Sequence, residues 1–385
     1  MVSNMNLQRN SHRNLRALIV TFTILIHLSS CNETEKQSTQ NLPIGEGQGN
    51  PVFEFTSYPI GEPAPTTTIA LADINNDNWL DIILGNGRHS GGQNGYFLNT
   101  GKSSFEGMVQ FGYEYSPTIG IAAAYINDDD FIDLLVGNGS CKDKYPSCEQ
   151  VPSLVFLNTG NPPYFIESSS DFPSKLRSVA LGDFGTDELT DVLLGSSKGA
   201  PQSVIGYKNL GQGNFDENAD FVLTQSSGTA ATTALAVADL NKDGISDIVA
   251  GNRGSWSSFE STIHPLTVFF GLEQGGFSDG LALDLDMHYQ TLGLALADIN
   301  NDGYLDIIAA RGGETPPNSS GQQNKVYLFN EASGDYDDNS AILFGTGNDA
   351  SRGVAIADMN DDGRLDILVS NECEASYIYL QDEKG

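Results

Sequence analysis

Short apolar runs alternate with acidic and glycine-rich turns along most of the chain. In one unit, the run 234–238 leads into an acidic turn and the run 248–250 leads out of it. The runs are rich in Val, Ile, Leu and Ala, and none continues with the 3.6-residue periodicity of a helix. Short runs of this composition, bounded by Gly and Asn, predict β-strands and an all-β fold.

The acidic turn occurs six times. The copies begin at residues 73, 125, 183, 239, 298 and 358, which are 52 to 60 residues apart. Each turn is followed by an aromatic-aliphatic run, such as 96–98 or 326–329, and most units then have a glycine-rich turn and an aromatic residue. We expect these aromatic residues to begin a fourth strand; they are Phe105, Phe165, Phe215, Phe277 and Tyr336. A repeat of this size matches one four-stranded antiparallel sheet.

Small residues in the first run of each unit indicate crowding around a central axis. Together with the repeat, they predict a β-propeller of six four-stranded blades, with seven blades as the alternative. The last unit ends before its aromatic residue, whereas Phe53 precedes Asp73 by 20 residues, the same separation as between Phe105 and Tyr125. We therefore expect the segment that begins at Phe53 to supply the outer strand of the last blade and to close the ring.

The N-terminal residues 1–30 have the features of an export signal. Three arginines and no acids accompany the apolar run 17–28, which is shorter than the ~20 residues that a membrane-spanning helix needs. The sequence Leu-Ser-Ser-Cys31 resembles the lipobox of bacterial lipoproteins, which implies a lipid on Cys31, with ordinary secretion as the alternative. Residues 31–50 are polar and aperiodic and read as a flexible tether, which leaves 51–385 for the propeller.

The chain is strongly acidic, with 50 Asp and Glu against 19 Lys and Arg and a net charge of -31. Such a surface repels nucleic acids and anionic lipid headgroups, so we expect contact with a membrane only through the N-terminal lipid. We also expect a monomer. Four cysteines are too few for a disulfide scaffold, but Cys141 and Cys148 bracket a short loop that a disulfide could close, leaving Cys373 unpaired. Cations are the partners that the acidity favours.

The turn that begins at Asp239 has side-chain oxygens at its positions 1, 3, 5 and 9 and Gly244 at position 6. Carboxylates that converge in this way repel one another without a cation, and Ca²⁺ takes about 6–8 oxygen ligands. We therefore predict about four to five Ca²⁺ sites, with solvated turns as the alternative. The predicted ligands in the four complete turns are Asp73, Asn75, Asp77, Asp81, Asp239, Asn241, Asp243, Asp247, Asp298, Asn300, Asp302, Asp306, Asp358, Asn360, Asp362 and Asp366.

Two turns depart from this pattern. The third has Gly185 and Glu188 where Asn and Gly usually stand, so its occupancy is left open. Its predicted ligands are Asp183, Asp187 and Asp191. The second has Tyr125 in place of the first Asp, and we expect a weak or empty site there.

The Asp-x-Asn-x-Asp-Gly-x-x-Asp turns resemble the FG-GAP/VCBS repeats of integrin α-chain β-propellers and their bacterial relatives. Phe184-Gly185 and the Gly-Ala-Pro201 element add to this resemblance, which covers residues 51–385. It implies structural calcium on one face of a propeller. With the export signal, it implies a protein anchored by lipid to the bacterial outer membrane, on its periplasmic or surface side.

Basic residues gather at the opposite end of the predicted blades, in or beside the loops that follow the second strands. The candidate ligand-binding residues are Arg88, His89, Arg177, Arg253, Trp256, Arg311 and Arg352. Arginine binds carboxylates bidentately, so this face would suit an anionic glycan or an acidic protein in a binding or adhesion role. Loop residues kept for solubility are the alternative.

The alternative function is that of a polysaccharide lyase, in which an arginine neutralises a uronate and His89 or Tyr145 acts as the base. No nucleophile elbow, His-Glu-x-x-His or Cys-x-x-Cys motif is present, so we predict no catalytic residues.

Overall fold

The computed structural model describes residues 24–25, 66–87, 92–101, 104–140, 151–185, 187–196, 203–224, 231–253, 266–283, 290–312, 322–360, 362–371 and 376–381. These residues form β-strands and turns with one short 3₁₀-helix, η2 (Asp338–Ser340), and no α-helix. The all-β prediction is therefore confirmed. The expected closing strand at Phe53 and the tether lie outside the described residues. Within the predicted signal, only β1 (Ile24–Leu25) is described, and it pairs with Thr68 and Ile69 of β2.

The remaining strands form six main antiparallel sheets, in which strand order follows chain order. The first three sheets contain β2 (Thr66–Ala72), β3 (Asp81–Asn86), β4 (Gly92–Phe97) and β5 (Val109–Ser116); β6 (Thr118–Ala124), β7 (Asp133–Asn138), β8 (Ser153–Asn158) and β9 (Phe165–Phe172); and β10 (Leu176–Gly182), β11 (Asp191–Ser196), β12 (Ser203–Tyr207) and β13 (Phe221–Thr224). The other three contain β14 (Ala231–Ala238), β15 (Asp247–Arg253), β16 (Leu266–Phe269) and β17 (Leu281–Leu283); β18 (Thr291–Ala297), β19 (Asp306–Arg311), β20 (Gln322–Tyr327) and β23 (Ile342–Asp349); and β24 (Ser351–Ala357), β25 (Asp366–Asn371) and β26 (Tyr377–Tyr379). Between β20 and β23 the chain forms a separate two-stranded hairpin, β21 (Phe329–Asn330) and β22 (Asp335–Tyr336).

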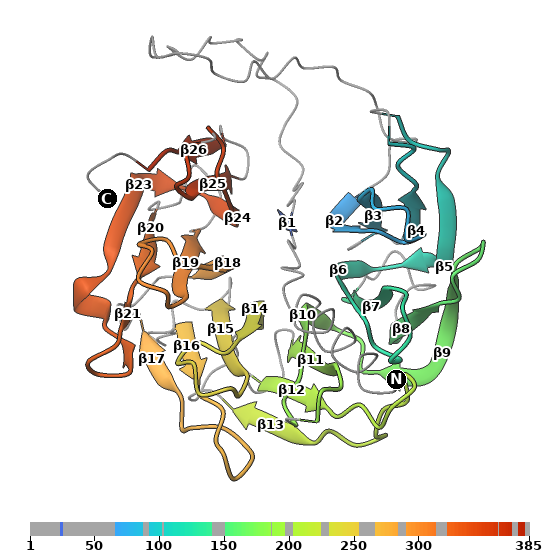
Figure 1. The fold of residues 1–385 in the computed structure, drawn as a ribbon, viewed down its shortest axis with the longest axis horizontal. Coiled ribbons are helices and arrows are strands. Elements are labelled where there is room, and N and C mark those ends of the chain that lie inside the picture. The colour runs from blue at the N-terminus through green and yellow to red at the C-terminus, as the bar shows by residue number, and fades with distance from the viewer. Residues whose placement is uncertain are drawn as a thin grey trace, which may run out of the picture.

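The sheets stand around a common axis, with the first strand of each sheet nearest to it (Figure 1). Successive first strands contact one another from β2 through β6, β10, β14 and β18 to β24. Side-chain hydroxyls also form hydrogen bonds across these boundaries. The Thr67 hydroxyl donates to the Thr118 carbonyl at 2.6 Å, and the Thr233 hydroxyl donates to the Thr291 carbonyl at 2.7 Å. This arrangement is propeller-like.

Small residues allow the sheets to approach closely near the axis. A Cβ atom on Gly137 of β7 would lie 2.3 Å from Val179 Cγ1 of the next sheet, and one on Gly85 of β3 would lie 2.8 Å from Thr118 Cγ2 of the next sheet. A real Cβ cannot occupy such a position, so glycine at these sites lets the strands pack where the wedge-shaped sheets are narrowest.

The fourth strand begins later than the sequence predicts in four of the five sheets in which it is described. Only Phe165 opens its strand, β9. Phe105, Phe215 and Phe277 instead form isolated bridges with Asn99, Asn209 and Gly271, and Tyr336 pairs with Phe329. These aromatic residues close the hairpin against the end of the third strand, and the outer strand then begins four to six residues further on, as at Val109.

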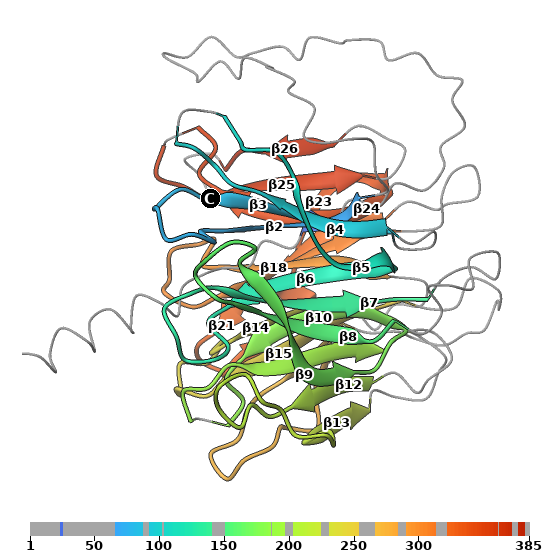
Figure 2. The same ribbon diagram turned by 90° about the vertical axis from the view of Figure 1, so that its right-hand side faces the viewer.

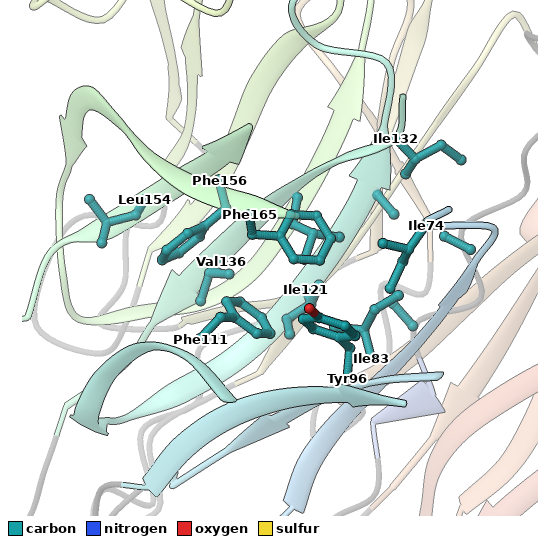
Figure 3. Packing of buried hydrophobic residues seen from close by; sticks show 14 residues of the cluster. Ile74, Ile83, Tyr96, Phe111, Ile121, Ile132, Val136, Leu154, Phe156 and Phe165 are labelled. Carbon is teal, nitrogen blue, oxygen red and sulfur yellow. The ribbon is translucent and has the colours of Figure 1, made fainter. Parts of the chain in front are cut away.

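The core consists of separate apolar clusters between neighbouring sheets rather than one central core. Figure 3 shows the cluster between the first two sheets, in which the rings of Phe111 and Phe156 meet edge to face with centroids 5.2 Å apart. The Tyr96 hydroxyl in this cluster donates to the Pro163 carbonyl at 3.0 Å, so its polar atom is satisfied. Comparable clusters join each later pair of sheets as far as the sixth.

Among the described residues, no such cluster joins the sixth sheet to the first. Leu71 of β2 and Ile378 of β26 are 44% and 48% exposed. Their counterparts in the second sheet, Ala123 and Val155, are buried against the first and third sheets respectively. The first and last sheets thus each have one exposed apolar face. In the interior sheets, the equivalent face is buried against a neighbouring sheet.

Candidate metal-binding turns

Each acidic turn connects the first strand of a sheet to its second strand. Because the strand order is the same in every sheet, all six turns lie at the same end of the molecule, at the ends of the strands seen from the side in Figure 2. The starts of the first strands and the ends of the second strands lie at the opposite end.

The turn at Asp298 shows how the side-chain oxygens converge. The backbone N–H of Asp302 donates both to Asp298 Oδ1 and to Asn300 Oδ1, each at 3.0 Å, so two side-chain oxygens point at one amide. Gly303 donates to Asp298 Oδ2 at 2.8 Å, and Asn300 Nδ2 donates to Asp302 Oδ2 at 2.8 Å. Oxygens from positions 1, 3 and 5 are thereby held together by the backbone of the turn itself.

The same bonds recur in the three other complete turns. The position 5 N–H donates at 3.0–3.1 Å to the oxygens of positions 1 and 3, and the position 3 amide donates at 2.9–3.0 Å to position 5. Position 6 takes a left-handed conformation, with φ of 86° at Gly244 and 71° at Asn78. The predicted reversal at position 6 is thus present, and asparagine fills it in the first turn.

The carboxylate at position 9 has a structural role that its place in the sequence motif does not indicate. All six of these carboxylates are buried. Oδ2 of each accepts the N–H of position 2 of the same turn at 2.8–3.0 Å. Oδ1 of each accepts an N–H from the end of the third strand of the same sheet, at 2.7–3.0 Å. The donor is the last residue of that strand or lies two residues after it. Position 9 therefore ties the acidic turn to the third strand.

Burial dominates the electrostatics of five of the position 9 carboxylates. It raises the pKa of Asp133, Asp191, Asp247 and Asp306 to about 6, and the backbone N–H groups that donate to each carboxylate oppose this shift only in part. The pKa of Asp81 is raised for the same reason. A carboxylate that accepts two backbone hydrogen bonds is satisfied without a metal, so the atoms best placed for a cation are those of positions 1, 3 and 5.

The donor set of the complete turns fits a hard cation. Two aspartates and one asparagine supply oxygens only, which suits Ca²⁺ rather than a transition metal. Within the described residues, no three His, Cys, Asp or Glu side chains group closely enough to hold a metal, so a cation in a complete turn would also need the amide oxygen of position 3. Each carboxylate oxygen has a second lone pair in addition to the one that accepts the N–H.

The second turn keeps the bonds of positions 3, 5 and 9 without a carboxylate at position 1. Asn127 Nδ2 donates to Asp129 Oδ2 at 2.8 Å, and Ile126 N–H donates to Asp133 at 2.9 Å. Tyr125 instead packs against the cluster between the first two sheets.

The third turn contains a lysine that sequence analysis did not single out. Lys208 Nζ lies 3.1 Å from Asp187 Oδ2, the oxygen that accepts the asparagine amide in the other five turns. Hydrogen bonding and charge from Asp187 raise the pKa of Lys208, with smaller contributions from Asp191 and Asp220. The signal was present in the repeat alignment, because the residue at this position is apolar in the five other units: Leu98, Leu157, Phe270, Leu328 and Leu380.

The four described candidate arginines lie at the end opposite the acidic turns. Arg253 and Arg311 were expected in loops, but they are the last residues of β15 and β19, paired with Ala231 and Thr291. They are only 5% and 2% exposed, and Arg352 near the start of β24 is 2% exposed. The strand register extends further than the apolar runs suggest, and it carries these side chains inward.

Arg177 near the start of β10 is the most accessible of these four arginines. Burial alone lowers the pKa of its guanidinium, with no acidic neighbour contributing. Arg88, His89, Tyr145 and Trp256 lie outside the described residues, as do all four cysteines. The base expected for a lyase is therefore not placed.

The repeats match known families. Residues 183–250 and 315–369 match the FG-GAP-like repeat, and residues 292–329 match the FG-GAP repeat. These ranges include the acidic turns that begin at Asp183, Asp239, Asp298 and Asp358. The chain contains FG-GAP repeats.

A curated relative supports this assignment. Integrin alpha pat-2 of Caenorhabditis briggsae is 28% identical over 218 residues. The match covers 50% of this chain and 17% of the integrin subunit, so the chain matches less than a fifth of that relative's length. None of the described residues belongs to a helix that is long and apolar enough to cross a membrane.

Proposed function

We propose that this chain is an extracytoplasmic binding module whose FG-GAP repeats are stabilised by calcium. The observation that supports it best is the convergence of oxygens from positions 1, 3 and 5 in four turns at one end of the molecule, as at Asp298, Asn300 and Asp302. The similarity to an integrin α subunit points to adhesion or binding as the type of activity. It also favours an extracellular location.

Calcium would act on the turns rather than on a substrate. The hydrogen bonds of each turn hold the carboxylates of positions 1 and 5 near each other, as at Asp298 and Asp302. These two negative charges repel one another, and a divalent ion offsets that repulsion. Because the six turns lie at one end, ions bound there would stiffen that end. An ion present at ~100 times its dissociation constant adds about 2.7 kcal/mol per site to the free energy of unfolding.

The test is thermal unfolding of the purified protein in calcium and in excess EDTA, together with bound metal measured by mass spectrometry. We expect a lower melting temperature in EDTA and about four bound ions. Asp298→Asn should remove one ion, whereas Glu114→Gln on the outer strand β5 should remove none. Identical melting curves with no bound metal would refute the calcium proposal.

We further propose that six sheets form a closed ring. The exposed apolar faces of the first and last sheets support closure, because Leu71 and Ile378 occupy positions that are buried in the interior sheets. The sixth sheet has three described strands, and the segment from Phe53 is our candidate for its fourth. Deletion of residues 51–60 should then lower the melting temperature.

The ligand that we propose is an anionic glycan or an acidic protein surface, bound at the end opposite the acidic turns. Arg177 is the residue of choice, because its guanidinium is partly desolvated without a neighbouring carboxylate. A charge-assisted hydrogen bond contributes about 1.5–3 kcal/mol, so Arg177→Gln should weaken binding by ~10-fold or more.

The matched control is Lys175→Gln, which removes one positive charge from an exposed position two residues away. Binding of both variants is compared on an array of acidic glycans and on acidic peptides. Equal affinity of Arg177→Gln and the unmodified protein would eliminate Arg177 as the anion contact.

Lipid attachment at Cys31 completes the proposal. We expect the exported protein to partition with membranes and to carry the mass of a lipid at its N-terminus, and Cys31→Ala to lose both properties. A soluble exported protein with an unmodified Cys31 would leave binding in place but remove the anchor.

A further inference from the structure

We propose that Lys208 supplies a built-in positive charge that replaces the divalent cation in the third acidic turn, so that this turn keeps its shape without metal. The inference rests on the proposed calcium-binding function of the other turns. It distinguishes the third repeat from its neighbours by a single side chain that comes from outside the turn.

The first supporting observation is the position of the ammonium group. Lys208 follows β12 directly, and its Nζ atom lies 3.1 Å from Asp187 Oδ2 at position 5 of the turn. In the turns at Asp239 and Asp298, the same oxygen of position 5 accepts the amide of Asn241 or Asn300. The lysine thus takes the place of that amide, and it brings the positive charge that an amide lacks.

The second observation is that the turn makes room for the lysine. A Cβ atom on Gly185, at position 3, would lie 2.9 Å from Lys208 Nζ and 3.3 Å from Asp187 Oδ2. An asparagine at this position, as in the other five turns, would displace the flexible end of Lys208 from its place beside Asp187. Gly185 and Lys208 therefore form a compensating pair: the repeat loses an oxygen ligand and gains a cation.

The third observation is that the turn keeps part of its hydrogen-bond pattern despite the missing asparagine. Asp183 accepts the N–H of Glu188, at position 6, at 2.9 Å, and Asp187 accepts the N–H of Leu189 at 3.2 Å, as in the complete turns. Asp183 Oδ1 accepts the N–H of Gly185 at 3.0 Å, where the complete turns use the N–H of position 5. Asp191 remains bonded to Phe184 and Asn209. The turn therefore remains ordered, with Asp187 beside the ammonium group.

A divalent ion and the lysine would disfavour each other at this turn. The ammonium group 3.1 Å from Asp187 Oδ2 repels a second cation at that carboxylate, and Gly185 offers no side-chain oxygen to a metal. Lys208 and Asp187 are 39% and 34% exposed, and an ion pair with that much solvent contact adds little to global stability. The effect of Lys208 should consequently appear in the local order of the turn rather than in the melting temperature.

Hydrogen–deuterium exchange of the whole protein, in calcium and in EDTA, tests the proposal. In the unmodified protein, the peptide that covers 183–191 should keep the same protection in both conditions, whereas the peptide that covers 298–306 should lose protection in EDTA. In Lys208→Met, which keeps the aliphatic stem but not the charge, the 183–191 peptide should lose protection in EDTA. Lys208→Arg, which retains a positive charge, should keep it.

Two results would overturn the proposal. One is a 183–191 peptide that responds to EDTA in the unmodified protein as 298–306 does, since the turn would then depend on metal despite Lys208. The other is unchanged protection of 183–191 in Lys208→Met in EDTA, since the charge would then hold nothing in place. If the protection of 298–306 is also unchanged in EDTA and no calcium is bound, the proposed calcium function is wrong. The comparison of Lys208→Met with Lys208→Arg in EDTA still tests whether the charge of Lys208 orders the third turn.

Discussion

The side-chain amide of Asn158 donates a 2.8 Å hydrogen bond to the carbonyl oxygen of Ile74, which belongs to the acidic turn of the preceding sheet. The backbone N–H of Asn158 donates at 2.7 Å to Asp133 in the turn of its own sheet. Asn209 repeats both bonds one sheet later, with Ile126 and Asp191 as its acceptors. Successive turns are therefore tied together across the boundaries between sheets.

We predict that Asn158→Ala lowers the free energy of unfolding by about 1–3 kcal/mol, because it leaves the Ile74 carbonyl without its buried partner. Urea denaturation measures this, with an unchanged m-value as the sign that only stability has altered. Asn99→Ala is the matched control. The side-chain oxygens of Asn158 and Asn99 accept the N–H of Gly160 and of Gly101 respectively, two residues further on, but the Asn99 amide donates to Leu80 of its own sheet in an exposed position. Equal losses in both variants would show that the bond between sheets adds nothing.

Asp133 predicts a pH dependence of stability. Burial raises its pKa from 3.8 in the unfolded chain to about 6 in the folded protein. Between these values the folded state retains a proton that the unfolded state has lost, so this group makes unfolding easier as the pH rises from about 4 to about 6 and has no further effect above that. The contribution is at most about 3 kcal/mol.

Asp133→Asn isolates this contribution, since asparagine does not titrate. Both proteins are measured in EDTA. As the pH rises from about 4.5 to about 6.5, the unfolding free energy of the unmodified protein should fall relative to that of Asp133→Asn. The second turn suits this test because Tyr125 replaces its first aspartate. A difference that stays constant over this range would mean that Asp133 is already ionised at the acid end.

The sequence predicted the fold class and the acidic turns because both depend on residues close together in the chain. The nine-residue pattern from Asp298 to Asp306 defines its turn by itself, and the apolar runs on either side define the two strands. The role of position 9 is different. Asp306 is held by the N–H of Phe329, which is 23 residues away, and a pattern read within the turn cannot reveal that bond.

The same limit explains the other differences. The burial of Arg253 and Arg311 depends on strand register, which continues past the apolar residues. Lys208 reaches the third turn only because β12 ends beside it. The outer strands begin beyond their aromatic residues because those residues first close the hairpin onto the third strand, as Phe105 does on Asn99. The first two of these features are contacts between segments that lie about 20 residues apart in the chain, and the third is a detail of hairpin geometry that an aromatic residue alone does not indicate.

Position 6 of the last turn allows the cost of its backbone conformation to be measured alone. Gly363 has a φ of 82°, and nothing lies within 4 Å of the place where a Cβ atom would be. Gly363→Ala should therefore lower the free energy of unfolding by about 1–2 kcal/mol through the left-handed conformation and not through a clash. Gly107 also has open space around it but no positive φ. Gly107→Ala should leave the free energy of unfolding unchanged or raise it by up to ~1 kcal/mol. A similar loss of stability in both variants would contradict the conformational explanation.

Closure of the ring makes a prediction about two side chains that lie far apart in the sequence. If the first and sixth sheets pack together as the other neighbours do, Leu71 and Ile378 enter an apolar interface. An aspartate in that interface would be a buried charge without a partner, so Leu71→Asp and Ile378→Asp should each cost about 3–5 kcal/mol. If the two faces remain in water, each change should lie within about 0.5 kcal/mol, as for other surface positions.

Ile342→Asp provides the reference, because Ile342 on the outer strand β23 is 51% exposed and thus comparable to Leu71 and Ile378. Urea denaturation of the three variants ranks their effects. A large loss in Leu71→Asp and Ile378→Asp beside a small one in Ile342→Asp means that the exposed faces meet, and it identifies them as the sixth interface of the ring. Equal, small losses in all three would instead indicate that the first and last sheets do not pack against each other and that the ring is open between them.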